Sequence, residues 1–116
     1  MNFYPISTIT FLLLSFTTVI GAEVNIYSHR QPFLINPFLE KFTEETGIKT
    51  NVVYATKGLA QRLKAEGKNS PADVILTVDI GRLYIYDDLD LLASVKSDIL
   101  ERNIPPNLKS PENKWF

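Results

Sequence analysis

The residues best suited to chemistry are His29, the only histidine of the chain, and Arg30, which follows it directly. A neutral imidazole can bind a metal ion or act as a general base. A guanidinium can hold an oxyanion through two parallel hydrogen bonds. Taken alone, both residues are more often found in turns without such a role, so at this point they mark a candidate site only.

A second polar pair, Thr77 and Asp79, lies where a predicted strand gives way to a predicted helix. Backbone N–H groups at such a helix start favour anions, but an aspartate there more commonly caps the helix. The tyrosines and aspartates of residues 84–90 have the composition of a metal-binding cluster. Helical periodicity places them at a helix end, where we expect them to form a solvated face.

Several classes of chemistry are excluded by what the sequence lacks. It has no cysteine, which excludes disulfides, thiolate metal sites, cysteine nucleophiles and a lipoprotein anchor. Neither glycine-rich phosphate loop is present, and no catalytic triad or carboxylate pair can be argued from spacing. We therefore expect no enzyme. Twelve basic against thirteen acidic side chains give a net charge of −1, so we also expect no nucleic-acid partner.

Residues 1–22 contain no aspartate, glutamate, lysine, arginine or histidine and include an apolar run over residues 6–20. This pattern, with a small residue at Ala22, predicts a secretory signal peptide whose apolar run is short for a membrane span. The first five residues contain no lysine or arginine, so an uncleaved membrane anchor or a wrongly chosen start codon remains an alternative. Cleavage after Ala22 would leave residues 23–116.

The rest of the chain alternates strands and helices. Strands are predicted over residues 24–28, 48–54 and 72–77, and helices over residues 36–46, 59–66 and 79–89. A further short helix is predicted from Asp98, which with Glu101 forms a capping-box pattern. The order β-α-β-α-β-α indicates an α/β fold with a mainly parallel sheet and right-handed crossovers. Ligands of such sheets bind at the carboxyl ends of the strands, which directs attention to residues 28–31, 54–58 and 77–79.

Four runs of sequence resemble a known family. They are VNIYSHRQPF at 24–33, FTEETGIK at 42–49, RLKAEG at 62–67 and NSPADVILTVD at 69–79, the last followed by GRL at 81–83. Together they resemble the periplasmic ferric-iron-binding proteins of ABC importers, which have the type II periplasmic binding-protein fold. The resemblance implies that residues 23–116 are a truncated amino-terminal part of the first lobe.

The resemblance also implies a cargo and a site. Family members clamp Fe(III) with a synergistic anion between two lobes and deliver it to a permease in the inner membrane. Fe(III) is a hard cation that prefers oxygen ligands, with imidazole as an occasional addition. Gln31 and Pro32 stand where many relatives have iron ligands, and neither is a good ligand for iron. Relatives whose loop ends Arg-Gln-Pro-Phe often have a tyrosine at the position of His29, so the resemblance makes His29 the best metal-ligand candidate of this lobe. The cleft or anion candidates implied by the same match are Arg30, Gln31, Thr77 and Asp79.

We therefore expect the substrate-binding component of an iron(III) importer, exported to the periplasm. Relatives are roughly three times as long, and their dominant tyrosine ligands lie in the second half. The expectation is thus an N-terminal fragment that does not bind iron tightly alone, with a separately encoded carboxyl-terminal portion as one conceivable partner. A binding subunit for another anion or organic solute, a non-functional gene remnant and an α/β enzyme are the alternatives.

Overall fold

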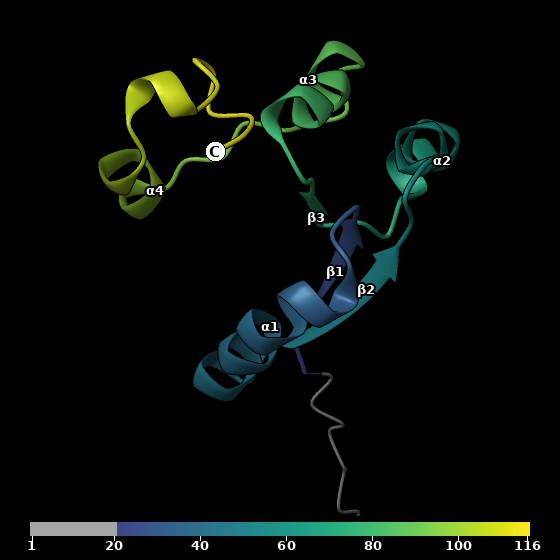
Figure 1. The fold of residues 1–116 in the computed structure, drawn as a ribbon, viewed down its shortest axis with the longest axis vertical. Coiled ribbons are helices and arrows are strands. Elements are labelled where there is room, and N and C mark those ends of the chain that lie inside the picture. Colours follow the sequence, from purple (N-terminus) through teal and green to yellow (C-terminus); the bar gives the residue numbers. More distant parts are fainter. Residues whose placement is uncertain (1–20) are drawn as a thin grey trace, which may run out of the picture.

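The computed structural model describes residues 21–116, so the predicted signal peptide lies outside the described residues except for its last two positions. Its centre is a three-stranded parallel sheet (Figure 1). Strand β1 (Glu23–Ser28) lies between β2 (Lys49–Tyr54) and β3 (Val74–Leu76). The predicted α/β fold with a parallel sheet is confirmed.

Strand β3 is shorter than the predicted strand over residues 72–77. At the amino-terminal end the regular pairing stops at Asp73, whose carboxylate accepts the backbone N–H of Asn25 at 2.8 Å. A side chain thus takes the position that a backbone carbonyl would hold in a regular ladder. Strand β3 pairs only with β1, so within the described part of the chain its outer edge has no neighbouring strand.

Helix α1 (Pro32–Thr46) begins four residues before the predicted start. Proline at the first helical positions is tolerated because its missing N–H would have no partner there. Pro37 lies inside the helix, but only one turn further on, where the hydrogen bond that it removes would have reached Phe33 in the first turn. The predicted end is confirmed, since Gly47 adopts φ 72° and its N–H donates to the carbonyl of Thr43.

Most of the large apolar side chains of α1 are exposed. Phe38 is 75% exposed and Phe33 is 73% exposed, whereas Ile35 is the buried residue of the helix. Helix α1 packs mainly against β2, at one side of the small sheet. The sheet is too narrow to cover the whole apolar surface of the helix.

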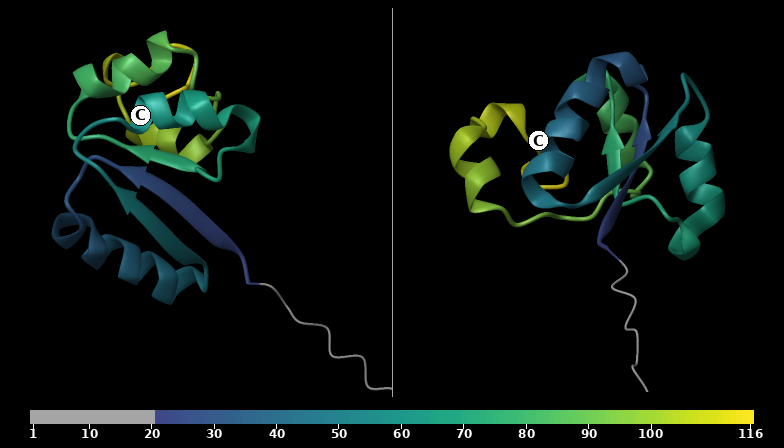
Figure 2. Two further views of the ribbon diagram at one scale, coloured as in Figure 1. Left: turned by 90° about the vertical axis from the view of Figure 1, so that its right-hand side faces the viewer. Right: turned by 90° about the horizontal axis from the view of Figure 1, so that it is seen from below.

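Helix α2 (Leu59–Glu66) covers the opposite face of the sheet (Figure 2). Its predicted bounds are confirmed. Helix α3 (Ile80–Asp88) is capped by Asp79, whose Oδ1 accepts the N–H of Arg82 at 2.7 Å, as the sequence predicted.

Helix α4 (Asp98–Asn103) completes the set, with short 3-10 turns at Gly67–Asn69 and Pro106–Leu108. The predicted cap of α4 is wrong by one residue. The hydroxyl of Ser97 accepts the N–H of Leu100, and Asp98 instead lies in the first turn. None of the helices in residues 21–116 is both long and apolar enough to cross a membrane.

The hydrophobic core lies between the sheet and helices α2 and α3. Its buried members are Tyr27, Leu59, Ala60, Leu63 and Tyr86. The burial of Tyr86, which is 1% exposed, corrects the expectation that the whole of residues 84–90 faces water. Its neighbour Asp87 accepts the indole N–H of Trp115 at 3.0 Å, so the carboxyl-terminal segment packs against this end of α3.

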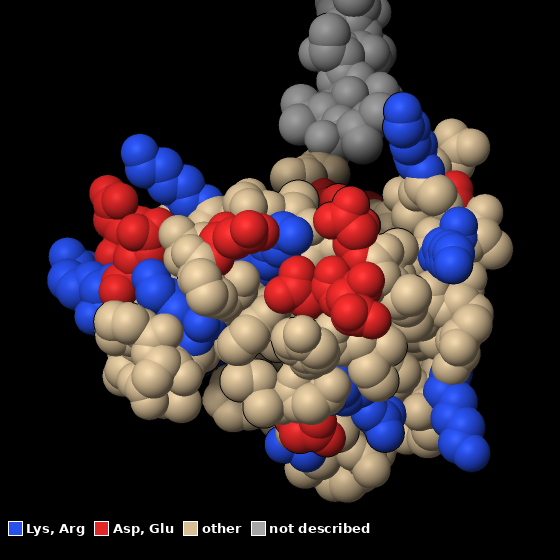
Figure 3. Space-filling view, turned by 90° about the horizontal axis from the view of Figure 1, so that it is seen from above, with Lys and Arg blue, Asp and Glu red and all other residues tan. Residues whose placement is uncertain are grey.

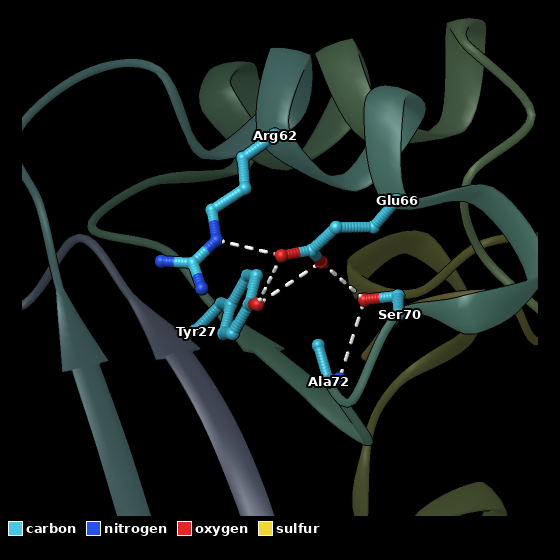
Figure 4. Close-up of polar contacts among 5 residues, drawn as sticks. All are labelled: Tyr27, Arg62, Glu66, Ser70 and Ala72. Carbon is cyan, nitrogen blue, oxygen red and sulfur yellow. Dashed lines mark hydrogen bonds and ion pairs between the residues drawn. The ribbon is translucent and has the colours of Figure 1, made fainter.

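A polar cluster closes the core at the end of α2 (Figure 4). The carboxylate of Glu66 accepts hydrogen bonds from Arg62 Nε at 2.7 Å, the Tyr27 hydroxyl at 2.8 Å and the Ser70 hydroxyl at 2.7 Å. The Arg62 guanidinium also lies over the Tyr27 ring. The bonds from Arg62 and Ser70 hold the pKa of Glu66 below its usual range, whereas burial raises the pKa of Tyr27. This Glu66 cluster ties β1, α2 and the approach to β3 together.

Candidate functional site

A hollow of about 220 Å³ lies at the carboxyl ends of β1 and β2. We call it the strand-end hollow. It is lined by His29 after β1, by residues 56–61 from the β2–α2 loop and the start of α2, and by Arg82, Ile85 and Tyr86 from α3. Its position is the one that parallel sheets use for ligands.

His29 lies at the wall of this hollow and is 7% exposed. Its Nδ1 is 2.7 Å from the carbonyl oxygen of Ala55, and its Nε2 is 2.6 Å from the hydroxyl oxygen of Tyr86. Because a carbonyl only accepts, Nδ1 carries the ring proton and donates it to Ala55. In the neutral ring Nε2 is then an acceptor, and the Tyr86 hydroxyl donates to it.

Two cationic side chains, Arg82 and Lys57, also line the hollow. Arg82 donates from a guanidinium nitrogen to the carbonyl of Thr56 at 3.0 Å, and Lys57 lies on the same wall. The first turn of α2 adds backbone N–H groups that have no partner within the helix. Burial raises the pKa of Tyr86, although the charge of Arg82 lowers it in part. The phenol therefore stays protonated at neutral pH in the absence of a metal ion.

The other predicted site residues lie elsewhere. Thr77 and Asp79 line a separate hollow of about 280 Å³ that also includes Trp115 and Phe116, and the Thr77 hydroxyl donates to the backbone carbonyl of Asp79. Arg30 and Gln31 are exposed in the loop before α1. The structure thus brings only His29, of the five predicted residues, to the strand-end hollow.

Two residues of the hollow escaped the sequence analysis. Arg82 and Tyr86 are four residues apart on α3 and therefore share one face of the helix. The Asp79 cap fixes the start of α3, so the shared face of Arg82 and Tyr86 follows from the sequence, whereas its contact with the loop after β2 does not.

A second groove and the distribution of surface charge lie outside the strand-end hollow. A wider groove of about 510 Å³ runs between α1 and β2, lined by Asn36, Leu39, Glu40, Thr43, Glu44 and residues 49–52. It does not reach the carboxyl end of β2. On the face shown in Figure 3, acidic and basic side chains are interspersed and form no continuous basic surface. Within residues 21–116, no three histidine or acidic side chains are grouped to hold a metal ion.

No family model matches the sequence. Curated relatives do match. The chain is 46% identical over 95 residues to iron uptake protein A1 of Synechocystis sp., and 28% identical over 92 residues to the Fe(3+)-binding periplasmic protein of Serratia marcescens. These alignments cover 81% and 78% of this chain but only 26% and 27% of the relatives.

Solved structures of iron-binding proteins are similar to this chain in both fold and sequence. Ferric iron-binding protein A of Mannheimia haemolytica, in an open conformation, matches with a TM-score of 0.79 at 49% identity. A Trichodesmium protein in complex with iron and citrate matches with a TM-score of 0.76 at 42% identity. These matches cover 83% and 82% of this chain and 30% of each solved chain. Over the region that it shares with them, which is less than a third of their length, the chain is a homologue of the periplasmic ferric-iron-binding proteins.

Proposed function

We propose that this chain provides part of the first lobe of the iron(III)-binding subunit of an ABC importer, a binding protein and not an enzyme. The observation that carries the proposal is the match in fold, at 49% identity, to a ferric iron-binding protein over 83% of the chain. Fe(III) with a synergistic anion is the cargo, and an inner-membrane permease is the partner that receives it. The complex of one relative with iron and citrate supports the pairing of ion and anion.

Within this proposal, His29 is the metal ligand of the lobe, and the cleft or anion residues are Arg30, Gln31, Thr77 and Asp79. The position of His29 supports its role, because it lies at the carboxyl end of β1 on the wall of the strand-end hollow. Its Nε2 carries the lone pair that a metal ion needs, and at present this lone pair accepts the Tyr86 hydroxyl.

The proposed location is the periplasm, reached through cleavage of a signal peptide of residues 1–22. Its support is the uncharged apolar head of the sequence and the periplasmic name of one relative. Retention by an uncleaved segment is the competing arrangement. The size of the exported chain in a periplasmic extract separates them, because cleavage after Ala22 shortens the chain by the first 22 residues.

A polypeptide partner is also proposed, namely the further sequence that relatives possess, whether in the same chain or a separate one. The exposed apolar surface of α1 and the outer edge of β3 support it, since exposed phenylalanines and free strand edges are typical of contact surfaces. The relatives are three to four times as long as the matched region.

Ferric citrate binding tests the proposal. The chain, purified from a Gram-negative host, is heated with ferric citrate, with iron-free citrate and with other small anions. We expect an iron-dependent rise in the unfolding midpoint, corresponding to about 1.4 kcal/mol when the ligand is at ten times its Kd. Because one lobe portion supplies few ligands, we expect a high Kd. An equal rise with iron-free anions would instead support a subunit for another solute, and tight stoichiometric iron binding would contradict the expected weakness.

A further inference from the structure

We propose that His29 Nε2 and Tyr86 Oη form a two-atom binding site for the ferric ion, in which the metal replaces the proton that the two atoms now share. The inference rests on the proposed function and extends it to a residue of α3. Tyr86 becomes a metal ligand, and Ala55 becomes the group that orients the imidazole.

The geometry of the pair supports this. Two adjacent ligands at about 2.0–2.1 Å from an octahedral metal ion lie about 2.9 Å apart. Nε2 and Oη lie 2.6 Å apart, a few tenths of an ångström less than this separation, and an entering ion also has to move the hydroxyl off the axis of the Nε2 lone pair. Both residues line the strand-end hollow, which gives the ion room on their open side.

The second nitrogen of His29 is already held as it is in metal sites. Histidine ligands commonly donate their other ring N–H to a carbonyl or carboxylate, which fixes the tautomer and the direction of the free lone pair. The Nδ1–H of His29 donates to the Ala55 carbonyl at 2.7 Å and so leaves Nε2 as the ligand atom.

The chemistry balances without any change of oxidation state. Fe(III) binds phenolate oxygen strongly and accepts imidazole nitrogen. On binding, the Tyr86 hydroxyl releases one proton to solvent, and the neutral imidazole contributes its lone pair. Each ion that binds in this way therefore releases one proton from the phenol.

The charge of the hollow determines the form in which the ion enters. Arg82 and Lys57 line the same hollow and would repel a bare trivalent cation. A ferric ion that carries an oxyanion avoids this repulsion, because the anion faces the two cationic side chains. Ferric citrate is therefore the probe, and iron-free citrate is its control.

Among the described tyrosines, Tyr86 is the one paired with His29. Tyr27 donates to Glu66, and Tyr84 is 61% exposed on the same helix as Tyr86. Tyr84→Phe is therefore the matched control for Tyr86→Phe. Both variants lose one phenol from α3, but only one of them changes the proposed site.

The full chain is titrated with ferric citrate while the visible absorption of a phenolate–Fe(III) pair is recorded. We expect the band in the wild type and in Tyr84→Phe, and its loss in Tyr86→Phe with affinity lowered by more than about 100-fold, beyond the loss seen for outer partners of metal ligands. Circular dichroism checks that the variants are folded. A band retained by Tyr86→Phe would overturn the inference.

A second measurement needs no variant. His29 is the only histidine, so its ring nitrogens can be followed by NMR while gallium(III) citrate, a diamagnetic analogue, is added to the wild type. We expect the Nε2 resonance to move far more than the Nδ1 resonance, and unchanged ring resonances at saturation would overturn the inference. If iron raises the unfolding midpoint but neither the phenolate–Fe(III) band nor the shift of the His29 ring resonances is seen, only the His29–Tyr86 site is rejected. Absence of that rise rejects the proposed function and the site together.

Discussion

Helices α1 and α2 lie on opposite faces of the same sheet, and they differ sharply in how well they are packed. On the α2 face, Leu59 is 2% exposed and Tyr27 is 1% exposed, and the Glu66 cluster closes the end of the helix. On the α1 face, Phe33 and Phe38 extend into solvent and only Ile35 of the helix is buried.

The difference in burial shows which side of the sheet contributes most to the stability of the described residues. Burial of apolar side chains is the main source of folding free energy, so the α2 face carries most of it. The strand-end hollow lies on this stabilised side, where His29 and Tyr86 are held by hydrogen bonds. The α1 face instead presents apolar surface that contributes little to the stability of the described residues.

The largest expected difference comes from removing one apolar side chain on each face. Leu59→Ala should lower the free energy of unfolding by about 2–5 kcal/mol, because it leaves a cavity in the core. Phe38→Ala should change it by less than about 0.5 kcal/mol, because the ring is exposed. Urea unfolding of both variants checks this. Equal losses would mean that α1 is packed as firmly as α2.

The Tyr86 hydroxyl offers a smaller test on the stabilised face. Tyr86→Phe should cost about 1–3 kcal/mol, because it leaves the buried Nε2 of His29 without a hydrogen-bond donor. Tyr84→Phe, on the exposed side of the same helix, should cost almost nothing. Thermal unfolding of the two variants without metal distinguishes them. A neutral Tyr86→Phe would show that the hydrogen bond does not stabilise the fold.

The sequence predicted the parts of the fold that depend on local patterns. Alternating β-branched strands separated by helices were enough for the parallel sheet, and Asp79 and Gly47 were correctly predicted as helix boundaries. The start of α1 was predicted wrongly, because Pro37 was interpreted as a first-turn proline, whereas the helix begins at Pro32 and Pro37 lies one turn inside it.

The site was less predictable because its contacts are distant in sequence. His29 meets Ala55 and Tyr86, which are 26 and 57 residues away, and no short motif records either pairing. Thr77 and Asp79 were predicted near the same strand ends, yet they line another hollow because their side chains serve the start of α3. Their roles as cleft residues remain proposals.

The N-cap of α4 should contribute less to the free energy of unfolding than the core residues do. Ser97→Ala should cost about 1 kcal/mol, because it removes the acceptor for the N–H of Leu100. Asp98→Ala should cost less, since Asp98 contributes only its charge to the first turn of α4. Denaturant midpoints of the pair decide which residue is the cap. A larger loss for Asp98→Ala would restore the capping-box prediction.

The smallest effect is a change in pH dependence. The pKa of Glu66 is lowered in the folded state, so its contribution to stability is present above the unfolded pKa of about 4.3 and is lost as pH falls through the folded value. Glu66→Gln should therefore flatten the fall of the unfolding midpoint in acid. Glu45→Gln, at an exposed ion pair with Lys41, is the control. Parallel acid profiles for wild type and Glu66→Gln would contradict the role of the cluster.

The proposed site places the ferric ion on the stabilised α2 face of the sheet. The most direct measurement is a crystal structure of the chain grown with ferric citrate, with the iron located by its anomalous scattering. We predict an iron peak in the strand-end hollow, within bonding distance of His29 Nε2. A peak in the groove between α1 and β2, or at Thr77 and Asp79 without His29, would contradict the claim.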